Sequence, residues 1–230
     1  MALDTTSDWG GAAIFRDAEC LATSAQQGFT NYSVSLFQAV NDALEKARLR
    51  LSEIDLYAAA NGPGSFTGIR VGLAAVQGWA QAFDKPAYGV SVLEAMAEEA
   101  QAQTRFALSL LDARRGEFYA RLFHRTVPVS RLTPQREGAI LKPENIAPFI
   151  QSHAPPGEGC TLAARENDPQ ACALAQSLLA SLPWKTVSGF LFSAIARVAL
   201  YEAQAERSVL PQDLSAYYIR RPDAEINWKP

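Results

Sequence analysis

The first third of the chain shows two different rhythms of apolar and polar residues. Three short apolar pieces follow one another with turns between them, as in an antiparallel meander: residues 1–4, 11–15 and 19–24. Over residues 33–49 the apolar positions instead recur in steps of three and four, at Val34, Phe37, Val40, Leu44 and Ala47. This spacing predicts an amphipathic helix that buries one face.

Strands and helices alternate after this helix. The run IDLYAAA, residues 54–60, is almost continuously apolar, which is typical of a strand covered on both faces. The pattern then predicts a helix over 67–83, a strand over 87–91 and a helix over 92–103. A meander followed by this alternation predicts an α/β unit.

The same order begins again near residue 105. An apolar strand ends in Asp112, and a turn at Arg114 to Gly116 leads into a second, alternating strand. Asp4 ends the first strand of the chain in the same way. Two strand-ending aspartates, each opening a hairpin, indicate a duplicated unit. We therefore expect one lobe over residues 1–103 and a smaller, more divergent lobe over residues 104–230.

Beyond residue 142 the pattern is weaker. It predicts two helices and a late strand, over residues 169–182, 192–205 and 215–222.

Composition and charge narrow the class of protein. Apolar residues make up 48% of the chain and the formal net charge is -3, so the chain as a whole lacks a basic footprint for nucleic acid. Any RNA is therefore expected to be held by a partner. Cys20, Cys160 and Cys172 form no CxxC pair and suit a reducing compartment. With no apolar stretch near the roughly 20 residues that a bilayer requires, we expect a cytoplasmic protein.

The loop NGPGSFTGIRVGL, residues 61–73, admits three interpretations. Gly62 and Gly64 can take positive φ, Pro63 stiffens the turn, and Ser65 or Thr67 can cap the helix, so the loop could form an anion nest. It lacks the lysine of a P-loop and the third glycine of GxGxxG.

Ser65 as a nucleophile would need a base, and the chain's two histidines are His124 and His153. No GxSxG elbow surrounds the serine. The third interpretation is a structural turn that brings helices close. Gly68, Gly72 and Ala75 support it, because small residues at such spacing let another backbone approach, and each glycine weakens an isolated helix by roughly 1 kcal/mol.

Five segments together resemble the bacterial TsaB (YeaZ) family of tRNA threonylcarbamoyladenosine biosynthesis proteins, also described as peptidase M22-like or glycoprotease-like. They are LDTTS (3–7), GPGSFTGIRVGLAAVQGWA (62–80), GVSVLEAMA (89–97), LDARRGEFYA (111–120) and YYIRRPDAEINWKP (217–230). GPGSFTG followed by IRVG is the specific element, whereas LDTTS alone is weak. The resemblance runs from end to end and is strongest over the first 125 residues.

The resemblance implies an actin-like ATPase fold of the sugar kinase, Hsp70 and actin type, related to ribonuclease H, with two duplicated lobes. It implies a non-catalytic dimerisation and scaffold subunit that pairs with the catalytic paralogue TsaD and works with the ATPase TsaE, touching tRNA only indirectly. Family members self-associate through helices of the first lobe, which makes Gly68, Arg70, Gly72 and Ala75 candidates for a partner interface. No resident cofactor is implied, and ATP or ADP with Mg²⁺ are candidate ligands at the partner interface.

Departures from the family limit what carries over. Catalytic relatives hold a metal through HxxxH on a helix, a spacing that puts both histidines on one face. The helix that begins at Ser33 contains no histidine, so no metal site is expected, and Asn31-Tyr32-Ser33 replaces the histidine triplet of many members. Only three residues precede Asp4, so either the first strand is short or the start codon has been placed late. A short central strand is expected to lower stability.

The remaining candidates carry charge or an aromatic ring. Asp4 and Asp112 are interpreted as turn acceptors first and as vestigial nucleotide-site or magnesium ligands second. Arg114 and Arg115 could neutralise a phosphate or a partner's carboxylate, or lie in a solvated turn. Trp228, near the end of the chain, is expected to contact either a partner or the second lobe.

Two functions of different class follow. The main hypothesis is the scaffold subunit. The rival is an actin-like phosphotransferase or nucleotide hydrolase that uses Asp4, the Gly62–Gly64 loop and Asp112. A peptidase is disfavoured because the chain offers neither a nucleophile with a base nor a metal pair.

Overall fold

The structure is a computed structural model that describes residues 1–126, 131–155, 157–178, 182–207 and 209–220. The chain divides into two compact units, Met1–Ala95 with Gly189–Tyr217, and Met96–Ser188 with Tyr218–Pro230. This division corrects the expected boundary, because residues 189–217 return to the first unit although they were assigned to the second lobe. The interpretation of Trp228 lies outside the described residues.

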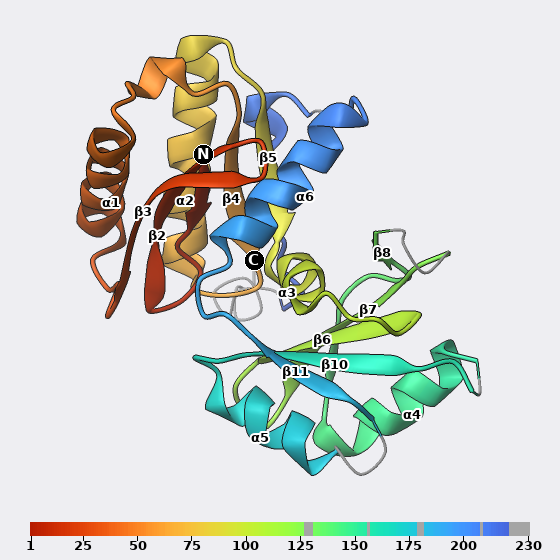
Figure 1. Cartoon of the computed structure of the whole chain (residues 1–230). Helices are drawn as coiled ribbons and strands as arrows, with labels where there is room; N and C mark the ends of the chain where they lie inside the picture. The colour runs from red at the N-terminus through yellow and green to blue at the C-terminus, as the bar shows by residue number, and fades with distance from the viewer. Residues whose placement is uncertain (127–130, 156, 179–181, 208, 221–230) are drawn as a thin grey trace, which may run out of the picture. The chain divides into compact units, whose positions relative to one another are not determined.

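The first unit is built on a five-stranded sheet in the order β3-β2-β1-β4-β5. Its strands are β1 Ala2–Asp4, β2 Trp9–Arg16, β3 Glu19–Gln27, β4 Tyr57–Gly62 and β5 Ala87–Ser91. In Figure 1, α6 (Phe192–Gln204) crosses one face of this sheet, and α1 (Tyr32–Ala47) and α2 (Phe66–Phe83) pack on the other. The apolar strand β4 is consequently covered on both sides, as its composition predicted.

The second unit repeats this topology. Its sheet has the order β11-β10-β6-β7-β8, with β9 also paired to β7. Its strands are β6 Phe106–Asp112, β7 Phe118–His124, β8 Thr133–Pro134, β9 Ala139–Leu141, β10 Cys160–Arg165 and β11 Trp184–Val187. In both units the first strand is antiparallel to the second and parallel to the strand after the crossover. The duplication that the two strand-ending aspartates predicted is therefore present in the strand order.

Helices of the second unit cover one side of its sheet in Figure 1, namely α4 (Pro143–His153) and α5 (Pro169–Ser177). Their buried residues join an apolar core with the inward residues of the strands, including Ile146, Ile150, Ala171 and Ala175. α5 ends at Ser177, short of the predicted 169–182. α3 (Val92–Ala100) is also shorter than predicted, because Gln101 takes a positive φ of +43° and ends it.

The buried face of α1 differs from the predicted one. Val34 and Phe37, which the periodicity placed in the core, are 51% and 50% exposed. Leu36, Ala39 and Ala43 are buried in their stead, together with Val40 and Leu44. α1 carries apolar residues on two neighbouring faces, so spacing alone could not decide which face meets β2 and β3.

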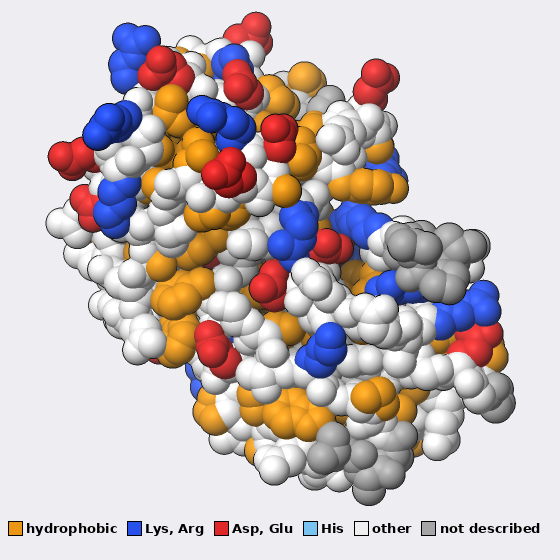
Figure 2. All heavy atoms as spheres, viewed as in Figure 1, with side chains coloured by type: hydrophobic (Ala, Val, Ile, Leu, Met, Phe, Trp, Pro, Cys, Tyr) orange, Lys and Arg blue, Asp and Glu red, His pale blue; other side chains and the backbone are white. Residues whose placement is uncertain are grey.

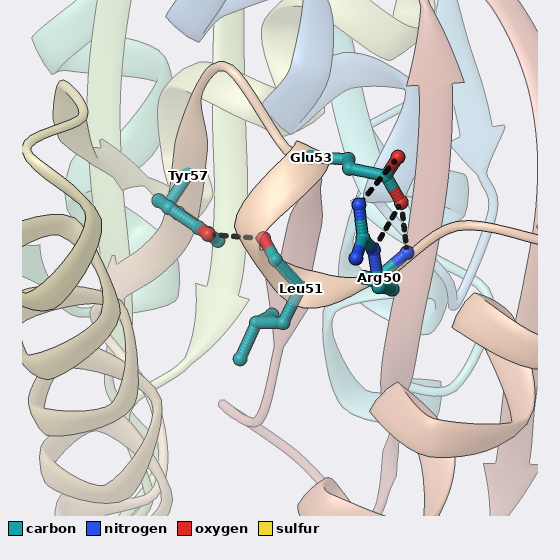
Figure 3. A network of polar contacts seen from close by, with 4 residues as sticks. All are labelled: Arg50, Leu51, Glu53 and Tyr57. Atoms are coloured by element: carbon teal, nitrogen blue, oxygen red, sulfur yellow. Dashed lines mark hydrogen bonds and ion pairs between the residues drawn. The ribbon is translucent and has the colours of Figure 1, made fainter.

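The connection from α1 to β4 is fixed by two sets of polar contacts around the short helix η1 (Leu51–Glu53), shown in Figure 3. The Glu53 carboxylate accepts from the backbone N–H of Arg50 at 2.8 Å and from its Nε at 3.2 Å. The hydroxyl of Tyr57 donates to the carbonyl oxygen of Leu51 at 2.6 Å, and burial raises the pKa of this phenol to about 12. These contacts set where β4 enters the sheet.

Candidate functional site

The loop before α2 uses backbone donors for its own fold. Ser65 donates its N–H to the carbonyl oxygen of Thr6 at 2.7 Å, and its Oγ accepts from the N–H of Gly68 at 3.2 Å. The predicted helix cap at Ser65 is thus confirmed, while Thr67 is exposed on the first turn. The anion nest stays a prediction, and these hydrogen bonds count against it because a nest needs free N–H groups for its ligand.

A segment from the end of the first unit lies against the same loop. The N–H of Tyr217 donates to the carbonyl oxygen of Asn61 at 2.7 Å, and the Asn61 side chain donates to Ser215 at 3.3 Å. Gly62 has a φ of +115°, and a Cβ there would lie 2.8 Å from the carbonyl oxygen of Tyr217. Glycine is therefore needed at 62 to admit this segment.

The expected late strand over residues 215–222 is wrong for its described part, because residues 215–220 form no strand. Ser215 and Tyr217 instead bond to Asn61, a loop residue more than 150 positions away in the sequence. No local pattern could have revealed this partner.

The two glycines of α2 that were assigned to a partner interface face the interior of the first unit. Thr5 Oγ1 donates to the carbonyl oxygen of Gly68 at 2.7 Å, and a Cβ at Gly68 would overlap the Thr5 carbonyl oxygen. A Cβ at Gly72 would lie 2.6 Å from Thr5 Oγ1. These glycines thus permit close packing against Thr5 of the same chain. This corrects their assignment to a partner interface.

The outer sides of α1 and α2 carry a different set of residues. Phe66 is 40% exposed, and the guanidinium carbon of Arg70 lies 3.8 Å from the centroid of its ring. Ala74 and Gly78 are exposed, and the position where Gly78 would carry a Cβ has no atom within 4 Å. Ala75, the remaining candidate, is half-buried.

The two helices join through the ring of Phe37, which lies edge-on to Trp79 at 6.1 Å between centroids. The surface that results is apolar with one cation, and we call it the helical face: Val34, Phe37, Phe66, Arg70, Ala74 and Gly78. Its aromatic rings beside small residues are suited to packing against another protein. Of the predicted interface residues, only Arg70 belongs to it fully.

Both strand-ending aspartates accept hydrogen bonds from the hairpins that they open. Asp4 Oδ1 accepts from the N–H of Thr6 at 3.0 Å and from its Oγ1 at 2.7 Å. Asp112 Oδ1 accepts from the N–H of Arg114 at 2.8 Å. These are the turn contacts that the first interpretation expected. Among the described residues, no group of three or more His, Cys, Asp or Glu side chains could hold a metal ion.

Asp168 is a buried carboxylate that the sequence did not single out. It caps α5 by accepting from the N–H of Ala171 at 2.9 Å, and its other oxygen accepts from the N–H of Asp112 at 2.7 Å. Burial outweighs these two hydrogen bonds and raises the pKa of Asp168. Asp before Pro169 is a helix-start signal that could have placed the cap, but not the contact with the hairpin.

Both histidines belong to the second unit, whereas Ser65 belongs to the first. His124 stacks on Phe106 at 6.3 Å between centroids. His153, at the end of α4, contacts Arg136 through its ring. No helix in the described part of the chain is long and apolar enough to cross a membrane.

Two α/β units of the same topology, each opening with an aspartate-ended strand and hairpin, define the fold of actin-like ATPases. The solved structure of YeaZ from Pseudomonas aeruginosa superposes with a TM-score of 0.71 over 94% of this chain and 97% of that one, at 22% sequence identity. A second P. aeruginosa structure, of an uncharacterized protein with similarity to peptidase YEAZ, gives a TM-score of 0.72 at 21% identity over 95% and 98% of the two chains. The predicted fold class is confirmed.

Comparison of the sequence identifies the family. The family model of TsaD, tRNA N6-adenosine threonylcarbamoyltransferase, matches residues 25–153, and the chain belongs to this family. A tRNA threonylcarbamoyladenosine biosynthesis protein TsaB from Escherichia coli is 33% identical over 154 residues, 66% of this chain and 65% of that protein. The TsaB of Bacillus subtilis is 30% identical over 123 residues, 54% of each chain.

The match spans between about half and two thirds of the length of these curated relatives. The resemblance to TsaB (YeaZ) proteins that the five segments carried is confirmed by these relatives.

Proposed function

We propose that this chain is a non-catalytic scaffold subunit in the formation of N6-threonylcarbamoyladenosine in tRNA. The observation that carries the proposal is the helical face, which presents two half-exposed phenylalanines on paired helices in a protein of this family. Exposed aromatic rings around small residues are typical of an interface that buries them.

The partners that fit this proposal are a TsaD-like paralogue, a second copy of the chain and a TsaE-like ATPase. The paralogue has the same fold, so it offers equivalent helices for packing against α1 and α2. In the proposed assembly the paralogue supplies the transfer chemistry and this chain supplies the surface that holds it. ATP or ADP with Mg²⁺ would then bind where the partners meet.

The test is the light-scattering mass of the purified chain, alone and mixed with its paralogue. Phe37→Asp places a charge on the helical face, and Gly78→Leu adds bulk where nothing clashes within the chain. We expect either change to weaken pairing at least tenfold, about 1.4 kcal/mol. Leu210→Asp is the matched control, because Leu210 is 60% exposed in the same unit but outside the helical face.

Unchanged masses for both variants, or an equal loss in the control, would contradict the proposed interface. Reconstitution with the paralogue and the ATPase completes the test: modified nucleoside should form only when all are present. Transferase activity from this chain alone would refute the scaffold role. The rival phosphotransferase predicts a rise in melting temperature with Mg-ATP, whereas the scaffold alone predicts none.

A further inference from the structure

The turn between β6 and β7 has a backbone conformation that is unfavourable for arginine. Arg114, Arg115 and Gly116 have φ values of +63°, +58° and +72°. The N–H of Glu117 donates to the carbonyl oxygen of Arg114 at 3.1 Å, so Arg115 and Gly116 are the two central residues of the turn. A turn with positive φ at both centres favours Asn-Gly, and a residue with a Cβ is strained there.

Side chains from three segments hold this turn in place. Arg220 donates to the carbonyl oxygen of Ala113 at 2.9 Å and forms an ion pair with Glu117. Asp112 accepts from the N–H of Arg114, and the buried Asp168 accepts from the N–H of Asp112. The surroundings thus maintain two successive arginines in a conformation that neither favours, which points to a use of the side chains.

Both arginines are exposed, and the side chain of Arg114 retains 87% of its accessible surface. Its Nη1 lies 3.4 Å from the carboxylate of Asp112, whose side chain is 16% exposed, so this ion pair leaves most of the Arg114 side chain in contact with solvent. The hairpin tip therefore carries two exposed arginine side chains on a firm base. Guanidinium groups bind phosphate oxygens through paired hydrogen bonds.

The balance of charge differs between the two units. The second unit has thirteen Lys and Arg against eleven Asp and Glu, whereas the first has eight against thirteen. On the face drawn in Figure 2, blue and red side chains are interspersed, so a site for a polyanion would have to be local. The net charge of -3 for the whole chain conceals this difference.

We propose that Arg114 and Arg115 form a finger that binds backbone phosphates of tRNA. The inference rests on the proposed function and extends it, since the chain was expected to touch tRNA only through a partner. An RNA strand offers successive phosphates, so both arginines can be engaged whatever the base sequence. An acidic protein surface is the alternative that the experiment must exclude.

The experiment is titration of the full chain with a fluorescent, unmodified tRNA transcript, at about 50 to 200 mM KCl. Arg115→Asn gives the turn its favoured Asn-Gly sequence, and a second variant adds Arg114→Asn. We expect affinity to fall several-fold for each arginine removed, and the salt dependence to decrease by about one counterion for each phosphate left without its arginine. The melting temperature should stay equal or rise, because strain is relieved.

Arg48→Asn is the matched control. Arg48 is exposed at the end of α1 with a φ of +56°, so the control removes the same charge and relieves the same kind of strain in the first unit. Its affinity for tRNA should remain that of the unaltered chain. A loss equal to that of Arg115→Asn, an unchanged salt dependence, or no binding by the unaltered chain at about 50 mM KCl would overturn the proposal.

Two further measurements distinguish tRNA from a nucleotide and from a protein carboxylate as the ligand of Arg114 and Arg115. Displacement of the tRNA by ATP, with ionic strength held constant, would assign the tip to a nucleotide and overturn the RNA assignment. Loss of pairing with the paralogue in Arg115→Asn, with tRNA binding intact, would assign it to a protein carboxylate. Failure of the proposed scaffold function gives a different result, because the unaltered chain would then form no complex with the paralogue.

Discussion

At the scale of single residues, the glycines of α2 separate two uses of a small side chain in a helix. Gly68 and Gly72 face Thr5 inside the first unit, while Gly78 faces open space. In the sequence all three look alike, because each is a helical glycine at a spacing of four to six residues. Their surroundings differ because α2 crosses over the β1–β2 turn at its first turns only.

This difference predicts opposite effects of alanine. Gly68→Ala should lower the free energy of unfolding by about 1 to 3 kcal/mol, since its Cβ overlaps a backbone oxygen that cannot move aside. Gly78→Ala should raise it by up to about 1 kcal/mol through helix propensity. Urea denaturation of both variants measures the contrast. A stabilising Gly68→Ala would contradict the close approach of Thr5 to this glycine.

At the scale of elements, periodicity identified α1, α2 and α6 but left their orientation open. α1 was predicted to bury Val34 and Phe37, and these residues are half-exposed on the helical face. Hydrophobic spacing reports that a helix has an apolar face, and α1 has two adjacent ones. The packing of α1 against β2 and β3 decides which of them enters the core.

The connection between α1 and β4 can be tested by changing Tyr57. Its hydrogen bond to Leu51 is partly buried, so Tyr57→Phe should lower the free energy of unfolding by about 1 kcal/mol at pH 8. The folded pKa is raised from 10.0 to about 12, so the unfolded chain loses this proton first as pH rises. The stability that the phenol contributes is complete below pH 10 and disappears between pH 10 and 12.

Urea unfolding of both proteins at pH 8 and pH 11 tests this sign. We expect the advantage of the unaltered chain over Tyr57→Phe to shrink or reverse at pH 11, by up to about 1.4 kcal/mol per pH unit. Other tyrosines titrate in both proteins and cancel in the difference. A constant difference at the two pH values would show that Tyr57 ionises equally in the folded and unfolded chains.

At the scale of the whole molecule, the first unit is made of two separated stretches of chain. α6 lies on its sheet with five buried residues, Phe192, Ala194, Ile195, Val198 and Ala199. The lobe expected over residues 1–103 therefore lacks one cover of its central strands. An exposed sheet face of this kind does not form a stable domain.

We predict that a fragment of residues 1–103 stays unfolded or aggregates. A fragment in which residue 95 is joined through a short glycine-serine linker to residue 189, ending at residue 217, should fold. Circular dichroism melting and amide proton dispersion in NMR distinguish the two. A cooperative melt for the fragment 1–103 would contradict the discontinuous unit.

The sequence by itself determined the α/β class, the duplication, most helices and strands, and the family. Each of these rests on local or repeated signals: apolar periodicity, strand-ending aspartates and the GPGSFTG segment. The prediction that Ser65 or Thr67 caps α2 is confirmed for Ser65, because a cap depends on residues within one turn.

Tertiary structure alone decided what the glycines of α2 contact, which face of α1 is exposed, and where residues 189–217 belong. It also brought Asp168 to the hairpin of Asp112 and laid Tyr217 on Asn61. The contacts of Gly68, Asp168 and Tyr217 join residues 56 or more positions apart, and the exposed face of α1 depends on its packing against β2 and β3. Sheet pairing and burial of the whole unit set all of these contacts. Local spacing carries no information on such partners, because the same apolar pattern is compatible with several packings.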